Sequence, residues 1–109
     1  MAKKIDRYSE FWSFYLGEHR KPVTRALHYF GTALGLGILV AALVTQIWWL
    51  LIGAVVSGYL FAWIGHFFVE KNRPATFTYP VWSFISDFRM FGTWLAGRMG
   101  HELARYQIR

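Results

Sequence analysis

The sequence predicts an all-α integral membrane protein. The expected helical bundle combines a transmembrane helical hairpin with an N-terminal interfacial helix and a C-terminal interfacial or re-entrant helix. Hydrophobic residues make up 55% of the chain and charged residues only 17%, whereas soluble domains carry about 25% charged residues. Two long runs, 26–44 and 47–69, contain no Asp, Glu, Lys or Arg, and a span needs about 20 apolar residues. Only Thr45 and Gln46 separate these runs, which predicts an antiparallel hairpin.

Length, cysteine content and charge further restrict the class of protein and its partners. A chain of 109 residues is expected to form a single membrane-embedded domain, 1–109. It contains no cysteine, which excludes a disulfide framework and a thiolate metal site. The net charge is +6, but the basic residues flank apolar runs instead of forming a polar face, so no nucleic-acid partner is expected. A soluble bundle with a very apolar core is the alternative fold.

The N-terminal segment 5–19, IDRYSEFWSFYLGEH, mixes charged and aromatic residues and predicts a short helix at a membrane surface. Its members Phe11, Tyr15 and His19 share one face at four-residue spacing. We expect the following RKP, residues 20–22, to end this helix, because proline disfavours a helical residue before it. No small-residue cleavage site follows a short apolar core, so no cleaved signal peptide is expected.

Cations set the expected orientation of the hairpin. Three precede the first run and two follow the second, whereas the turn carries none: Arg20, Lys21, Arg25, Lys71 and Arg73. The positive-inside pattern therefore predicts that both open ends are cytoplasmic, in a bacterial-type inner membrane or in the endoplasmic reticulum. Small residues in both runs suit close helix approach in lipid: Gly31, Gly35, Gly37, Gly53, Ser57 and Gly58.

The last segment, 79–109, is aromatic and helical in character but contains Asp87, Arg89 and Arg98. A third span would carry Arg98, Arg105 and Arg109 to the far side, against the positive-inside pattern. We therefore expect a helix in the cytoplasmic interface, or a re-entrant one, in preference to a third span.

Four histidines are the strongest functional signal. His28 lies about 18 residues before the turn and His66 about 20 after it, so their predicted distances from the turn are ~27 and ~30 Å. His19 lies just outside the first run and His101 follows the last basic segment, so all four can meet at one membrane face. Neutral imidazoles without a thiol suit iron, copper or zinc. The alternative is that they are interhelical hydrogen-bond partners or, for His101, simply solvated.

Glu70 follows His66 by four residues, which places both on the same face of an α-helix. It could accept a hydrogen bond from that imidazole, bind a metal directly, or form a salt bridge with Lys71, Arg73 or Arg25. Asp87 and Arg89 likewise admit a role in a site or in a structural ion pair.

Three motifs carry a family resemblance. YLGEHRKPVTRALH holds His19 and His28 with eight residues between them, WIGHFFVEKNRPA holds His66 and Glu70, and GHEL holds His101. With these motifs the sequence resembles the membrane 2-hydroxy fatty acid dioxygenases of fatty-acid α-oxidation and phytosphingosine degradation.

The resemblance implies Fe(II) held by histidines, O2 as cosubstrate, and conversion of a 2-hydroxy fatty acid to the acid one carbon shorter. It implies His19, His28 and His66 as iron ligands. His101 would be a fourth ligand displaced by substrate, or a hydrogen-bonding neighbour. The candidate catalytic residues are Glu70, Lys71 and Arg73; the two cations, or Arg89, would attract the carboxylate.

The acyl tail of such a substrate would stay in membrane lipid or in a groove between helices. A homo-oligomer is left open, because His101 could complete the site of a neighbouring subunit. Two other classes of function fit the same residues. One is a haem- or metal-binding membrane protein without oxygenase activity, in which His28 and His66 bracket a haem. The other is a structural membrane protein whose histidines are packing residues.

Overall fold

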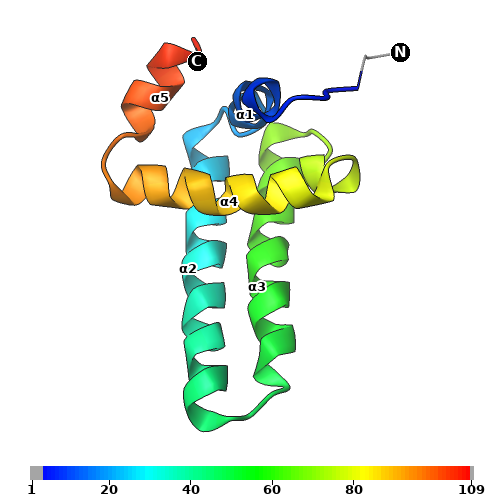
Figure 1. Cartoon of the computed structure of the whole chain (residues 1–109), viewed down its shortest axis with the longest axis vertical. Helices are drawn as coiled ribbons and strands as arrows, with labels where there is room; N and C mark the ends of the chain where they lie inside the picture. Colours follow the sequence, from blue (N-terminus) through cyan, green and yellow to red (C-terminus); the bar gives the residue numbers. More distant parts are fainter. Residues whose placement is uncertain (1–3, 109) are drawn as a thin grey trace.

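A computed structural model describes residues 4–108, and this part of the chain is all-helical (Figure 1). Arg109, one of the basic residues used to argue against a third span, lies outside the described residues. The predicted fold class is confirmed. The elements in chain order are α1 (Tyr8–Gly17), α2 (Pro22–Thr45), α3 (Leu50–Ile64), the π-helix η1 (Gly65–Glu70), the 3-10 helix η2 (Ala75–Phe77), α4 (Pro80–Leu95) and α5 (Met99–Arg105).

The helices α2 and α3 form the predicted antiparallel hairpin (Figure 1). Pro22–Thr45 and the continuous helical stretch Leu50–Glu70 are both long and apolar enough to cross a membrane. The first helix begins at Pro22, before the predicted run, because the fixed φ of proline suits the first helical position. It ends at Thr45, because the next residue, Gln46, has a left-handed φ of 57°. The second helix begins only at Leu50, so residues 47–49 belong to the turn.

Two glycines of α2 let the hairpin helices pack closely. A Cβ at Gly31 would lie 2.9 Å from the carbonyl oxygen of Ser57, and one at Gly35 would lie 2.9 Å from that of Ala54. Real Cβ atoms do not approach an oxygen so closely, so these positions need glycine. Gly37 does not contribute to this close packing, since a Cβ there would meet nothing within 4 Å.

Helix α4 crosses the hairpin close to the end where α2 begins and α3 finishes (Figure 1). Its 16 residues measure ~24 Å, less than the ~30 Å hydrocarbon core of a bilayer. Gly97, with a φ of 73°, then turns the chain into α5. Both the length and the direction of α4 agree with the prediction of a helix that does not form a third span.

Helices α1, α4 and α5 together form a cap at the open end of the hairpin (Figure 1). Four of its residues are fully buried: Phe11, Trp12, Tyr15 and Leu16. The ring of Phe11 packs against Tyr79 and Trp82, with centroids 5.2 and 5.6 Å apart. The indole Nε1–H of Trp12 donates to the carboxylate of Glu102 on α5 at 2.9 Å. The aromatic face of α1 is therefore covered by protein, and the cap has its own aromatic core.

Candidate metal centre

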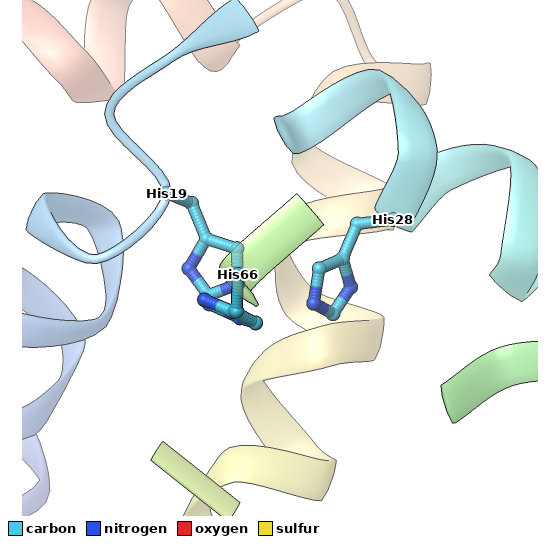
Figure 2. Close-up of side chains that lie close together, drawn as sticks. All are labelled: His19, His28 and His66. Carbon is cyan, nitrogen blue, oxygen red and sulfur yellow. The ribbon is translucent and has the colours of Figure 1, made fainter. Parts of the chain in front are cut away.

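Three histidines from three separate segments converge beneath the cap. His19 lies in the bend after α1, His28 near the start of α2, and His66 in η1, and their rings point toward one another (Figure 2). One ring nitrogen from each lies within 4.8 Å of the others. These three residues are 1%, 4% and 3% exposed, respectively. The predicted equal depth of His28 and His66 is confirmed by a distance of 5.7 Å between their ring centroids.

Close packing between Gly65 and Thr24 brings His66 toward His28. A Cβ at Gly65 would lie 3.0 Å from Cγ2 of Thr24, and Thr24 precedes His28 by one helical turn. The contact occurs where the chain changes from α3 to the π-helix η1, a local widening that is frequent at functional sites.

We therefore expect Gly65→Ala to destabilise the protein by about 1 kcal/mol, because the added methyl overpacks this contact. Adding Thr24→Ser should recover most of that loss, since serine lacks the methyl group in the way. Thermal unfolding of both single variants and the double variant in detergent measures the coupling. Additive losses would show that the contact does not limit the approach of the helices.

The bend that carries His19 is fastened to α2 by Arg25. The guanidinium donates to the carbonyl oxygens of His19 at 2.9 Å and of Arg20 at 2.8 Å. Arg25 was expected from the sequence only as an orienting cation or as a partner of Glu70. In the structure it fixes the backbone next to the imidazole of His19.

Hydrogen bonds donated by Nδ1–H orient two of the imidazoles. His19 Nδ1–H donates to the carbonyl oxygen of Tyr15 at 2.7 Å, and His66 Nδ1–H donates to Oδ1 of Asn72 at 2.8 Å. An oxygen acceptor at Nδ1 keeps the proton there and leaves Nε2 with a free lone pair. Nε2 of His19 is buried and has no hydrogen-bond partner, so a coordinated ion would satisfy an otherwise orphaned atom.

The third imidazole faces a carboxylate. Nδ1 of His28 lies 3.8 Å from Oδ1 of Asp87, and the same carboxylate accepts a hydrogen bond from the hydroxyl of Tyr15. Burial raises the pKa of Asp87 from 3.8 to about 7, an effect that the Tyr15 hydrogen bond opposes. Tyr15 thus supports the cluster twice, through its carbonyl group at His19 and through its hydroxyl group at Asp87.

The electrostatic environment favours neutral imidazole at His19. Burial lowers the pKa of His19 well below its ordinary value, and the neighbouring rings of His28 and His66 lower it further. Neutral imidazole is the form that binds metal ions. Three nitrogen donors within 4.8 Å of one another, two of them on rings that a hydrogen bond at Nδ1 holds in place, fit a divalent transition metal such as iron, copper or zinc.

The structure brings together three of the four histidines. Among residues 4–108, the group that could hold an ion comprises His19, His28 and His66, whereas His101 is exposed on α5. Glu70 lies at the end of η1, where its carboxylate accepts a hydrogen bond from the backbone N–H of Lys21. The ammonium group of Lys21 donates to the carbonyl oxygen of Val69 at 3.0 Å. Glu70 therefore joins the start of α2 to the end of the second long helix.

This position predicts a small effect of Glu70→Gln, because glutamine retains an oxygen that can accept the N–H of Lys21. Glu70→Ala removes that acceptor and should lower the free energy of unfolding by about 1 kcal/mol, as for other helix caps. Metal content and thermal unfolding of the two variants test this assignment. Loss of the metal in Glu70→Gln would instead identify Glu70 as a direct ligand.

The cationic candidates lie around the cap. Lys71 is exposed, with a left-handed φ of 60°. The guanidinium of Arg73 lies over the ring of Phe77 at 5.3 Å, and that of Arg89 lies over the ring of Trp12 at 4.0 Å. These stacking contacts give both arginines a structural role, while their exposed positions leave them accessible to an anion.

Asn72 orients one of the histidines, a role that was not predicted from the sequence. Its side chain binds His66 through Oδ1 and donates through Nδ2 to the carbonyl oxygen of Glu18 at 3.0 Å. The left-handed Lys71 turns the chain back, and the backbone N–H of Asn72 donates to the carbonyl oxygen of His66 at 2.9 Å. An amide side chain two residues beyond the helix whose last turns carry His66 was the available signal.

Comparison with known proteins gives one match. A family model described as 2-hydroxy-palmitic acid dioxygenase Mpo1-like matches residues 5–99. The matched range contains α1 to α4 and all three converging histidines. Neither the curated proteins nor the solved structures gave a significant match.

Proposed function

Because the chain belongs to the 2-hydroxy-palmitic acid dioxygenase Mpo1-like family, we propose that it is a non-haem iron dioxygenase acting on 2-hydroxy fatty acids. In this reaction R–CH(OH)–COOH and O2 give R–COOH, CO2 and water. The hydroxyl-bearing carbon becomes the new carboxyl carbon, the old carboxyl group leaves as CO2, and O2 takes up the electrons. The observation that carries the proposal is the convergence of His19, His28 and His66, whose ring nitrogens lie within 4.8 Å of one another.

His19, His28 and His66 would hold Fe(II). Three protein ligands would leave room at the ion for both a 2-hydroxy acid and O2. When bound, Fe(II) would activate O2 and orient the substrate through its carboxylate and hydroxyl groups. The unpartnered Nε2 of His19 supports this assignment.

The surrounding residues would keep this centre rigid. Asn72 and the carbonyl group of Tyr15 hold the Nδ1 protons of two ligands, and Asp87 faces the third. Lys71 and Arg73, exposed at the same end of the hairpin, would attract the substrate carboxylate. With the cationic ends of the hairpin in the cytoplasm, the centre would lie at the cytoplasmic side of the membrane.

The haem alternative is disfavoured by the position of His19. Its ring centroid lies 4.6 Å from that of His28 and 4.5 Å from that of His66. A porphyrin bracketed by His28 and His66 would have to occupy the space that this third ring fills.

Metal analysis of anaerobically purified protein, followed by incubation with 2-hydroxypalmitate and O2, tests the proposal. Stoichiometric iron, consumption of O2 and formation of pentadecanoate are expected. A strong Soret band would support the haem alternative. Iron-free protein that forms no shorter acid after loading with Fe(II) would refute the dioxygenase proposal and favour a structural role.

A further inference from the structure

An apolar groove begins at the metal centre and follows the seam between α2 and α3. Its volume is about 390 Å³, within the usual range of ligand pockets. His28 and Asp87 line the end beside the metal centre, while Leu39 and Leu51 line the end toward the turn. The groove is thus polar at one end and apolar along most of its length, which is the polarity of a fatty acid.

Helix α4 and a glycine of α3 shape this groove. Phe84 and Phe88 of α4 contribute to its wall near the cap. Gly58 lines the groove as well, and a Cβ there would meet nothing within 4 Å. The missing side chain at Gly58 therefore leaves open space in the path from the metal centre toward the turn.

The length of the groove suits a long acyl chain. His28 and Leu39 are 11 residues apart on α2, which corresponds to ~16 Å along the helix. An extended chain of carbons with bonds of about 1.52 Å and angles of about 111° advances ~1.25 Å per carbon. The groove therefore accommodates ~13 carbons beyond the two that carry the carboxyl and hydroxyl groups.

We propose that this groove binds the acyl tail of the substrate, extended from the metal centre toward the turn, and that Leu39 and Leu51 limit its length. The inference rests on the proposed function, because the metal centre fixes the polar head at the His28 end. The occupant is the tail of the substrate itself, because His28 belongs both to the groove and to the histidine cluster that would hold the head.

Gly58→Leu and Gly37→Leu form a matched pair to test the groove. Both add a leucine at a glycine of the hairpin where a Cβ meets nothing within 4 Å, but only Gly58 lines the groove. Gly58 lies beside Gly31 and Gly35, at ~5–10 Å below His28. A leucine there would obstruct a long tail and leave space for a short one.

We expect Gly58→Leu to lower turnover of 2-hydroxypalmitate about tenfold, because an obstructed tail displaces the head from the metal centre. Turnover of 2-hydroxyoctanoate should stay within about twofold of wild type, since its tail ends near the obstruction. Gly37→Leu should resemble wild type with both substrates. Equal losses on the long and the short acid in Gly58→Leu would overturn the inference.

Photolabelling tests whether the tail binds in the groove independently of whether the substrate is turned over. A 2-hydroxy fatty acid of palmitate length with a diazirine at its terminal carbon should label Leu39 or Leu51, and 2-hydroxypalmitate should compete. The label should disappear in Gly58→Leu and persist in Gly37→Leu. Competed labelling without a shorter acid product would support the groove and refute the dioxygenase.

Other labelling results would overturn the inference. Normal turnover combined with uncompeted label on the exposed residues Val40 and Ile52 of the two long helices would place the tail in the bilayer and overturn the inference alone. Label at Leu39 and Leu51 that 2-hydroxypalmitate fails to displace would assign the groove to a bilayer lipid, also against it. Absence of both competed label and product would refute the groove and the proposed function together.

Discussion

Replacing His19, His28 or His66 with alanine should in each case abolish iron binding and turnover while the protein still inserts into the membrane. Each substitution removes one of three converging nitrogen donors, and two imidazoles cannot replace the third. Loss of a direct ligand should exceed the 10–100-fold effect typical of residues that only orient a ligand, so we expect iron affinity to fall by more than about 100-fold. Insertion should persist because it depends on the apolar lengths of α2 and the Leu50–Glu70 stretch.

His101→Ala is the matched control for these three variants. Its side chain is exposed on α5, so this variant should retain iron and turnover close to wild type. Iron per chain in the purified membrane protein and oxidation of 2-hydroxypalmitate are the two measurements. If His66→Ala kept its iron, the imidazoles would be packing residues. Loss of iron in His101→Ala would show that α5, from the same or a neighbouring subunit, reaches the centre.

The hairpin and the level of two histidines could be predicted because both follow from distance along the chain. Two apolar runs and a short turn define antiparallel helices, and a fixed rise per residue then places His28 and His66 at equal depth. The grouping of Tyr15 and His19 also followed from their four-residue spacing, and their ring centroids are 4.2 Å apart. In each case, helix geometry over a short stretch of chain was sufficient to predict which residues lie close together.

The expected role of Glu70 beside His66 depended on an α-helix between them. That segment is the π-helix η1, in which the wider turn changes the direction of a residue four positions later. Asn72 contacts the imidazole instead. A change of helix type over six residues leaves no periodic pattern in the sequence, so the partner could not be assigned from spacing.

The position of His101 depends on long-range packing. The chain turns at Gly97, with a φ of 73°, and α5 is then fixed by contacts such as the hydrogen bond between Trp12 and Glu102. These two residues lie at opposite ends of the sequence. The support that His19 receives from the carbonyl group of Tyr15 likewise has no side-chain signature, because every residue has a carbonyl group.

Asn72→Ala should lower iron affinity by 10–100-fold, the usual effect of removing a residue that orients a metal-binding histidine. Without Oδ1 of Asn72, the Nδ1 proton of His66 loses its acceptor at 2.8 Å, and the ring can turn or change tautomer. Iron affinity can be measured by competition with a chelator, and turnover of 2-hydroxypalmitate at saturating iron shows whether the remaining centre still works.

Asn72→Asp separates the two contacts of this side chain. Aspartate keeps an oxygen for Nδ1–H of His66 but cannot donate to the carbonyl oxygen of Glu18, which Asn72 binds at 3.0 Å. If orientation of His66 is what matters, Asn72→Asp retains iron and Asn72→Ala loses it. If the two variants lose iron equally, the tether to Glu18 matters more, because that contact holds the end of the bend from which His19 projects. Wild-type affinity in both would show that burial alone keeps the ring of His66 in place.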